Sequence, residues 1–409
     1  MAINRGTTLE SFATVGDWTL SAGTLLADAV NVREGAANLQ MSTPNDSWCQ
    51  MTKTVSWNLS AMTNIAFRFF CPVATRPANV KIRIAVDSGV TKYFEYTFDP
   101  QPGWNDRVMA KAQFTAVGGA VAGDWAAIIR LVIRETANTG LVGQVTPDLL
   151  SKEYQGIDGR GTVIISLDDN RVTNYDYVWP QLAARDIRWT SFCHTGSVGN
   201  TGLCTLAQMK ELYADGVDIA AHGHAHLDLT SLTAAEMASD LSSVANYLKT
   251  NGFYDSAPFF AYPYGGYNAA VVAAVSSVKR FAMARTVIVH TDYAHQQPDG
   301  LVEFYLPGYG TDTIAASALL ATIDNIILSK GVLVLLFHNF VASSAGTSEY
   351  LKSEFETLAN GLVTRIGAGT LWVPTLSEYW RRLERLYSRG PVWKDKKLYP
   401  RTPGLPGGL

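Results

Sequence analysis

The stretch Val163-Ile164-Ile165-Ser166-Leu167-Asp168-Asp169 places a short apolar run directly before two carboxylates. A run of this length without alternation is typical of a strand buried on both faces, as in a parallel sheet. Helix signals separate it from later runs, among them capping boxes that begin at Thr205 and Thr233. The further strand candidates are residues 188–193, 217–221, 259–262, 280–284, 332–337 and 371–373. Seven such strands alternating with helices predict an α/β domain, a distorted (β/α)7 barrel whose working end lies at the strand carboxyl ends.

The first 150 residues follow a different pattern. In residues 80–86 and 129–134, apolar side chains alternate with other residues, as in antiparallel strands buried on one face. Turn formers separate these runs, and no long stripe with a period of 3.6 residues interrupts them. This half is therefore predicted to be an all-β sandwich of the jelly-roll type, and its general pattern resembles carbohydrate-binding modules that flank glycan-active enzymes.

Length and patterning together divide the chain into two domains and a tail. The 409 residues exceed what one hydrophobic core usually serves. We expect a carbohydrate-binding-like sandwich over residues 1–152, the barrel over residues 153–388 and a Pro/Gly-rich C-terminal tail over residues 389–409. The sequence gives no direct sign of the oligomeric state.

Composition narrows the range of partners. The net charge is −3, from 33 Lys+Arg and 36 Asp+Glu, so no broad positive field for nucleic acid is expected. No apolar run approaches the ~20 residues that span a bilayer, so membrane insertion is not expected either. The first residues lack the apolar segment of a Sec signal peptide. Four cysteines without CxxC spacing predict ordinary buried thiols.

Polar residues that could carry chemistry follow four of the predicted strands. In an α/β barrel, the loops at the strand carboxyl ends build the active site, so a shared location there is a functional signal. The residues are Asp168 and Asp169 after the first strand, His222, His224 and His226 after the third, Tyr262, Pro263 and Tyr264 after the fourth, and His338 after the sixth.

Asp169, His222 and His226 are candidate ligands of one divalent cation. Two adjacent carboxylates beside an apolar strand repel each other, and a cation relieves that repulsion. Histidines four residues apart can reach the same ion, and three protein ligands leave positions open for water and substrate. Each part alone has another reading: Asp168 and Asp169 suit a turn or a helix cap, the histidines suit a solvated loop, and His338 suits a core position.

Together, these motifs resemble the polysaccharide deacetylases of carbohydrate esterase family 4, over residues 160 to about 385. The resemblance implies a metal-dependent hydrolase that binds zinc, with Co2+, Ni2+ or Mn2+ as alternatives. The corresponding elements are residues 166–169 for T-F-D-D, 216–219 for the G-h-E-I that precedes the histidines, 222–226 for H-x-x-x-H, 263–265 for P-Y-G, and His338 for the late L-x-x-H. The implied metal ligands are Asp169, His222 and His226, and the implied substrate contacts are Tyr262, Pro263 and His224.

In the same resemblance, catalysis rests on Asp168 as general base and His338 as general acid, with the backbone N–H of Tyr264 helping to hold the oxyanion. The family's arginine that opens R-x-P-Y and orients the base is Ala261 here. Arg285 is a substitute by position, although a surface salt bridge is the more common role for such a residue. The D-x-x-D-W element that tunes the acid has no clear counterpart, so the sequence names no partner for His338.

We therefore expect a deacetylase that hydrolyses N-acetyl or O-acetyl groups of a polysaccharide, in particular a bacterial surface glycan. The alternative is a catalytically weak or inactive glycan-binding structural protein, such as a bacteriophage tail component. The missing arginine and the missing signal peptide motivate that alternative. In both cases the protein is expected to act outside the cell without Sec export, for example on a virion tail, with an acetylated polysaccharide as its partner.

Overall fold

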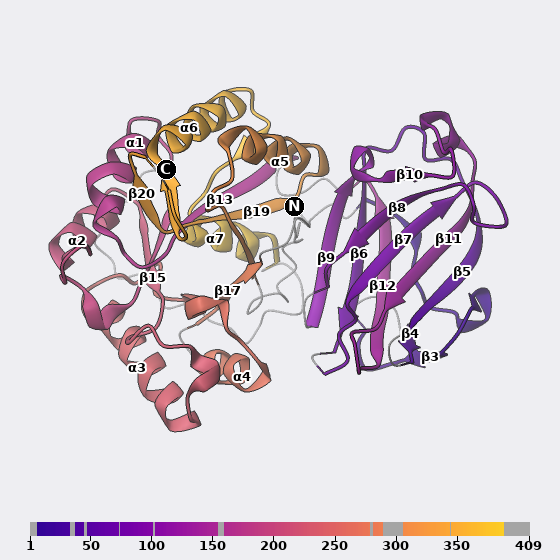
Figure 1. Cartoon of the computed structure of the whole chain (residues 1–409), viewed down its shortest axis with the longest axis horizontal. Helices are drawn as coiled ribbons and strands as arrows, with labels where there is room; N and C mark the ends of the chain where they lie inside the picture. The colour runs from indigo at the N-terminus through magenta and orange to yellow at the C-terminus, as the bar shows by residue number, and fades with distance from the viewer. Residues whose placement is uncertain are drawn as a thin grey trace.

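The computed structural model forms two lobes that lie side by side (Figure 1). It describes residues 6–32, 37–44, 47–72, 74–100, 103–153, 159–278, 281–288, 306–343 and 345–387. The first lobe contains the strands up to residue 152, and the second alternates strands with helices. The predicted tail at residues 389–409 lies outside the described residues.

The N-terminal lobe consists of two antiparallel sheets packed face to face, which confirms the predicted all-β fold. The first sheet has the order β3-β4-β12-β6-β9 with β1 beside β12, and the second has the order β10-β8-β7-β11-β5-β2. Alternation turns every second side chain toward the space between the sheets, where Phe67, Phe69 and Phe98 pack ring against ring. The strands are β1 (Thr7–Glu10), β2 (Thr19–Leu20), β3 (Thr24–Asp28), β4 (Asn38–Thr43), β5 (Trp48–Trp57), β6 (Asn64–Cys71), β7 (Asn79–Ala85), β8 (Tyr93–Phe98), β9 (Gly103–Ala110), β10 (Thr115–Val117), β11 (Ile128–Thr136) and β12 (Gly143–Lys152).

The second lobe is a closed ring of seven parallel strands, in agreement with the predicted (β/α)7 barrel. The strands run in the order β14-β15-β16-β17-β18-β19-β13, and pairing of β13 with β14 closes the ring. They are β13 (Gly161–Leu167), β14 (Thr190–Cys193), β15 (Asp218–Ala221), β16 (Phe259–Ala261), β17 (Met283–Ile288), β18 (Leu306–Gly310) and β19 (Val332–Phe337). The helices are α1 (Trp179–Ala183), α2 (Leu206–Ala214), α3 (Ala234–Thr250), α4 (Ala269–Ser277), α5 (Ala316–Ser329), α6 (Lys352–Gly367) and α7 (Leu376–Tyr387). The predicted capping boxes begin α2 and α3, where Thr205 and Thr233 accept from backbone N–H groups.

The ring corrects one of the predicted strands. β22 (Leu371–Trp372) was expected to belong to the barrel, but it pairs only with β13, outside the ring. The seventh strand is β18, which no apolar run marks because it reads Leu-Pro-Gly-Tyr-Gly. Its parallel pairing with both β17 and β19 places it in the ring. Tertiary pairing therefore overrides a local sequence that by itself argues against a strand.

Helix α7 covers the amino ends of the barrel strands. Its apolar side chains, including Tyr379 and Trp380, pack against residues in the interior of the ring. Asp218, at the start of β15, accepts from the backbone N–H and the hydroxyl of Ser377, each at 2.7 Å, and so holds the first turn of the helix. Because α7 covers this end of the barrel, the carboxyl end of the strands is the one left open for a site.

The first sheet of the sandwich lies against the barrel. β6 and β9 neighbour α5, and the Asn64 side-chain amide donates to the carbonyl of Ser329 at 3.2 Å. The second sheet, with β5 and β11, lies on the far side of the sandwich (Figure 1). In the described ranges, no helix is both long and apolar enough to cross a bilayer. All four cysteines are free and buried, as predicted.

Candidate metal and catalytic site

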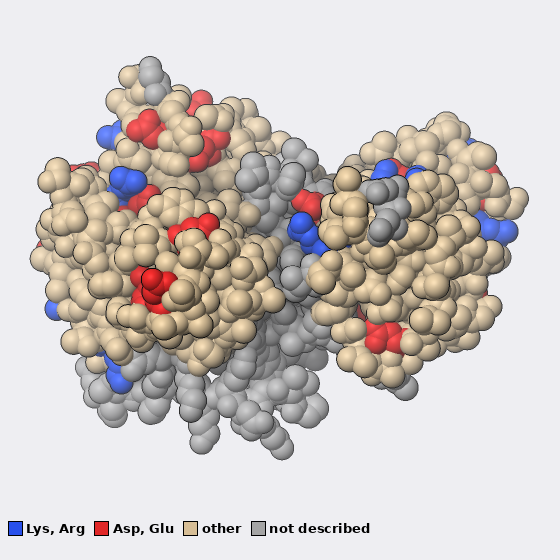
Figure 2. Space-filling model, turned by 60° about the horizontal axis from the view of Figure 1, so that its bottom comes forward, with Lys and Arg blue, Asp and Glu red and all other residues tan. Residues whose placement is uncertain are grey.

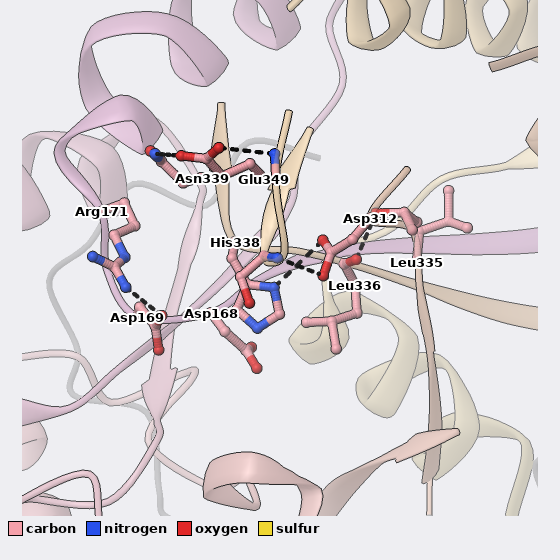
Figure 3. Close-up of polar contacts among 12 residues, drawn as sticks. Asp168, Asp169, Arg171, Asp312, Leu335, Leu336, His338, Asn339 and Glu349 are labelled. Carbon is pink, nitrogen blue, oxygen red and sulfur yellow. Dashed lines mark hydrogen bonds and ion pairs between the residues drawn. The ribbon is translucent and has the colours of Figure 1, made fainter. Parts of the chain in front are cut away.

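The chemistry-bearing residues gather at the carboxyl ends of the barrel strands. Asp168 and Asp169 follow β13, His222 follows β15, Tyr264 lies in a turn after β16, and His338 follows β19. β13 and β19 are neighbours in the ring, and Figure 3 shows the two aspartates at the end of one strand and His338 at the end of the other. Segments far apart in the sequence thus meet at one mouth of the barrel.

Asp169, His222 and His226 place possible metal-ligand atoms close together. One atom each from Asp169, His222 and His226 lies within 4.8 Å of the others. The Oδ1 atom of Asp169 is 3.2 Å from His226 Nε2 and 3.7 Å from His222 Nε2. The Nδ1 atom of His222 lies 2.9 Å from the carbonyl of Ala261, so Nδ1 donates there and Nε2 offers its lone pair to the cluster. One carboxylate and two imidazoles, with one imidazole fixed from behind, fit a divalent cation such as zinc.

The charges in the cluster favour the forms that bind a cation. Burial raises the pKa of Asp169, but His226, His222 and Arg171 outweigh burial and hold that pKa well below its usual value. Burial lowers the pKa of His222. An ionised carboxylate beside a neutral imidazole is the protonation state that metal binding needs.

The backbone of the site is held in conformations that residues other than glycine rarely adopt. The φ angles are 67° at Asp169, 53° at Asn170, 56° at His226 and 58° at Tyr264, all in the left-handed region. Each such residue costs on the order of 1 kcal/mol, and residues of this kind cluster at functional sites. Two of these residues, Asp169 and His226, are members of the candidate metal cluster.

Arg285 takes the place of the arginine that is missing at position 261. The Arg285 side chain has 0% exposure, and its Nη2 donates to both carboxylate oxygens of Asp168 at 2.5 Å. Ala261 on β16 is the register partner of Arg285 on β17, so the guanidinium starts one strand further around the ring. The more common role considered for Arg285, a surface salt bridge, is therefore wrong, because its side chain lies inside the barrel, beside the ring of Phe192.

Gly308 leaves room for this arginine. A Cβ atom at Gly308 would lie 2.7 Å from Cδ of Arg285 and 2.8 Å from the carbonyl of Thr286. Such distances are below any normal contact, and the backbone carbonyl cannot give way cheaply. Gly308 therefore has two effects. It makes the sequence of β18 unlike that of a typical strand, and it leaves space for the side chain of Arg285 beside β18.

Asp312, which follows β18, is the partner of His338 that the sequence did not name. Its Oδ1 atom lies 3.7 Å from His338 Nδ1, within ion-pair range of a protonated imidazole (Figure 3). The backbone N–H of Ser348 donates to the other oxygen of Asp312 at 3.1 Å and fixes the carboxylate. Burial lowers the pKa of His338, but Asp312 and Asp168 outweigh burial and raise it. A raised pKa keeps the imidazole protonated at higher pH, as a general acid requires.

The remaining predicted substrate contacts differ in exposure. Tyr264 is 70% exposed, and its ring lies 4.7 Å from that of His226, so it stands at the mouth of the site. His224 is partly buried, with Nδ1 3.0 Å from the Thr195 hydroxyl. Tyr262 is fully buried against Phe260 and Tyr267, and Pro263 is buried too. In this structure the ring of Tyr262 therefore has no surface that a sugar could contact, and the substrate contacts stay predictions.

Three further residues support the site without a motif to mark them. Arg171 donates to Asp169 Oδ2 at 3.0 Å. Asp240 on α3 accepts from the backbone N–H of His224 at 2.9 Å and so holds the loop that carries the histidine ligands. The ring of His194 lies 4.8 Å from that of His226, and burial together with the charge of His226 lowers the pKa of His194 to about 4. Arg171 stands close to the aspartate pair in sequence, and His194 directly follows the predicted strand 188–193, so both had a local signal, whereas Asp240 has none.

Charged side chains are scattered over the face of the molecule that Figure 2 draws. Figure 2 shows small, separated groups of Lys, Arg, Asp and Glu on the face in view, with most of that face formed by other residues. The expectation that nucleic acid is not a partner rests on the net charge of −3 and stays a prediction.

Part of the second lobe is similar to known proteins. Residues 155–280 match the family model of polysaccharide deacetylase. The YxkH protein of Bacillus subtilis (strain 168) is 32% identical over 106 residues, which are 26% of this chain and 38% of that protein. A chitin deacetylase of Arthroderma benhamiae is 26% identical over 181 residues, which are 41% of this chain and 46% of that protein. The chain thus spans less than half the length of the curated relatives it matches.

Among solved structures, the Xyl-CE4 domain of a multidomain xylanase from the hindgut metagenome of Trinervitermes trinervoides is 14% identical, with a TM-score of 0.38, over 55% of this chain and 91% of that chain. The family match ends before Arg285, Asp312 and His338, which join the site through β17, β18 and β19. It includes Asp168, Asp169 and the histidine cluster. The likeness to polysaccharide deacetylases that the family model shows is thus confined to residues 155–280.

Proposed function

We propose that this chain hydrolyses acetyl groups from a polysaccharide, with a divalent cation held by Asp169, His222 and His226. The observation that carries the proposal is the arrangement of two aspartates at the end of β13. Asp169 turns toward two imidazoles, whereas Asp168 is held by a buried arginine. One carboxylate is thereby set to bind a cation and its neighbour to accept a proton.

The general base in this proposal is Asp168. Its two oxygens accept from Arg285, and Oδ2 also lies 3.5 Å from His222 Nε2, so the carboxylate faces the cation site. When bound, the cation would polarise the acetyl carbonyl and make a water molecule more acidic. A carboxylate fixed beside that position can accept the proton of the water as it attacks. Zinc is the first candidate, with Co2+, Ni2+ and Mn2+ as alternatives.

The general acid is His338, on the strand next to that of the base. The Oδ1 atom of Asp312 lies 3.7 Å from Nδ1 of His338, and this carboxylate favours the charged form of the imidazole. A protonated imidazole can give its proton to the departing amine or alcohol, and neutralisation by Asp312 limits the cost of holding that charge half-buried. The backbone N–H of Tyr264, aimed by the strained φ of 58°, is the proposed donor to the oxyanion.

The proposed substrate is an N-acetylated or O-acetylated polysaccharide, such as a bacterial surface glycan, reached outside the cell or from a virion tail. The competing proposal, an inactive glycan-binding structural protein, was motivated in part by the alanine at position 261. Arg285 removes much of this reason, because its guanidinium binds Asp168 from another strand, as an arginine at position 261 was expected to do. The match of residues 155–280, which carry both aspartates, to the polysaccharide deacetylase model also supports a catalytic role.

The test measures acetate release and metal content together. We expect the zinc-loaded chain to release acetate from acetylated xylan or from chitin oligomers, and chelation to stop the release. Asp168→Asn should keep stoichiometric zinc but lose at least about 100-fold in rate, because a general base contributes that much or more. His222→Ala should lose the zinc. Asp176→Asn, the same change at an exposed position of the same lobe, is the matched control and should behave as the parent chain. Release that survives Asp168→Asn would refute the assignment of the base.

A further inference from the structure

The second sheet of the sandwich has one face that points away from the sandwich core, here called the outer face. Alternation in β5, β7, β8 and β11 turns one set of side chains, mostly apolar, toward the core and the alternate set, mostly polar or charged, outward. The register pairs Arg134 with Lys81 and Arg83 with Glu95 across neighbouring strands. The outer face comprises Trp48, Gln50, Thr52, Thr54, Lys81, Arg83, Tyr93, Glu95, Thr97, Arg130, Val132 and Arg134.

The outer face carries excess positive charge in a chain that is acidic overall. Four cations, Lys81, Arg83, Arg130 and Arg134, share the face with the carboxylate of Glu95, whereas the whole chain has a net charge of −3. Glu95 accepts from Lys81 at 2.8 Å and from Arg83 at 2.6 Å, so one carboxylate serves two cations. The excess of positive charge is confined to this face, and it favours an anionic partner over a neutral one.

Among the described residues, Arg130 and Arg134 are the cations of this face that form no ion pair with a carboxylate, since Glu95 pairs with Lys81 and Arg83. The guanidinium carbon of Arg134 lies 3.9 Å from the ring centroid of Trp48, and its Nε is buried without a hydrogen-bond partner among the described residues. Burial, followed by the charge of Arg83, lowers its pKa. Two like charges held side by side on a rigid sheet repel, and an anion between them would relieve the repulsion. Stacking on the indole fixes the guanidinium in place to receive it.

Aromatic rings accompany the cations. Trp48 is 42% exposed, and Tyr93 lies under Arg83, whose guanidinium carbon is 4.8 Å from the ring centroid. Hydroxyl and amide side chains, such as those of Thr52 and Gln50, fill the space between. Aromatic rings can contact the apolar faces of sugars, hydroxyl groups can bind sugar oxygens, and guanidinium groups can bind carboxylates. This combination matches a sugar polymer that bears acid groups.

We propose that the outer face binds an acidic polysaccharide whose sugar units carry carboxylates, with Arg134 and Arg83 pairing with the carboxylates and Trp48 contacting a sugar ring. β5 and β11 lie on the side of the sandwich away from the barrel (Figure 1), so this site is separate from the catalytic mouth. The proposal does not rest on deacetylation: the sheet would hold the polymer whether or not the barrel acts on it.

The experiment measures binding of the full chain to polygalacturonate by titration calorimetry. Polygalacturonate in which the acids are methyl esters is the matched probe, since it keeps the sugar backbone and removes the charge. We expect binding to polygalacturonate, at least about tenfold weaker binding to the ester, and weakening as ionic strength rises, because salt screens the attraction between opposite charges at a protein surface. Equal binding to both polymers, or binding to neither, would overturn the proposal.

Variants then locate the site. Arg134→Gln and Trp48→Ala should each weaken binding to polygalacturonate by about tenfold, the value of one charge-assisted hydrogen bond or one sugar stack. Lys210→Gln removes the same charge from an exposed position on the barrel and should leave binding unchanged. Thermal unfolding of each variant verifies the fold of the sandwich, and two independent variants guard against a failure of one to fold. Parent-like binding by folded forms of both would place the ligand elsewhere and refute the site. Equal binding of single-stranded DNA would show a general polyanion surface and would likewise refute the glycan.

Discussion

Replacing Arg285 by methionine tests whether this buried arginine positions the base. Methionine keeps most of the length and apolar contact of the arginine stem but removes both bonds to Asp168. Arg285 has no exposed side-chain surface and Asp168 has 3%, so water cannot replace the lost partner. The neighbour that is left to the carboxylate is His222, whose Nε2 lies 3.5 Å from Oδ2.

The size of the effect follows from that geometry. Removing one member of a buried ion pair costs roughly 3 to 5 kcal/mol of folding stability, and the nearby imidazole places this case at the lower end. A base that is no longer held in line should lose about 100-fold in kcat/KM for acetate release, the lower range of what positioned general bases contribute. Zinc content should not change, because Arg285 does not contact the three metal ligands. Arg285→Lys keeps the charge but not the planar donor group, so its kcat/KM should lie between those of the parent chain and Arg285→Met.

A second change can restore what the first removes. In the double variant Ala261→Arg with Arg285→Ala, the guanidinium begins at the register partner on β16 and fills the space that Arg285 vacates. We expect at least about tenfold recovery of kcat/KM over Arg285→Ala alone, since one well-placed charge-assisted bond is worth that much. The reasoning would be refuted by a folded, zinc-loaded Arg285→Met chain that releases acetate within about threefold of the parent rate, less than any positioned base contributes.

Three other predictions follow from named contacts. Gly308→Ala should reproduce the activity loss of Arg285→Met with zinc retained, because its Cβ would lie 2.7 Å from Cδ of Arg285; unchanged acetate release would show that the arginine has another path. Asp312→Asn should lower the pKa of His338 and move the alkaline limb of the pH profile of kcat/KM to lower pH, and an unmoved limb would contradict this role of Asp312. Burial raises the pKa of Glu135, in the sandwich core, to about 8 from 4.5. The stability that this proton provides is therefore complete below pH 4.5 and is lost as the pH rises toward 8, by roughly 3 to 5 kcal/mol. Glu135→Gln should abolish that slope in calorimetric unfolding, and a variant with the parent slope would exclude Glu135 as its source.

Local chemistry made much of the barrel and the metal cluster predictable. Buried parallel strands are continuous apolar runs, and Asp169, His222 and His226 are residue types whose spacing near strand ends has few uses other than holding a cation. The sandwich was predictable for a similar reason, because a period of two is visible in a single strand. In each of these cases the signal lies within a short segment.

The parts that escaped prediction depend on contacts between segments. β18 has no apolar run because Gly308 must lack a side chain, and only its pairing with β17 and β19 makes it a strand. Arg285 looks like a surface residue until the ring closes and turns its side chain inward. Asp312 stands beyond a strand that the sequence did not reveal, so its proximity to His338 could not be foreseen.

The arginine lies at position 285 on β17 and not at position 261 on β16, and this position also explains the small residues around it. Inside a closed ring, neighbouring strands are about 4.8 Å apart, so a long side chain from either strand can reach the same carboxylate. The interior, however, has room for one such chain. With Arg285 on β17, its partner on β16 has to be small, and it is Ala261; the other neighbour, β18, has to leave space at Cδ, and there it has Gly308. The alanine that seemed to mark a lost function is thus the complement of an arginine one strand away.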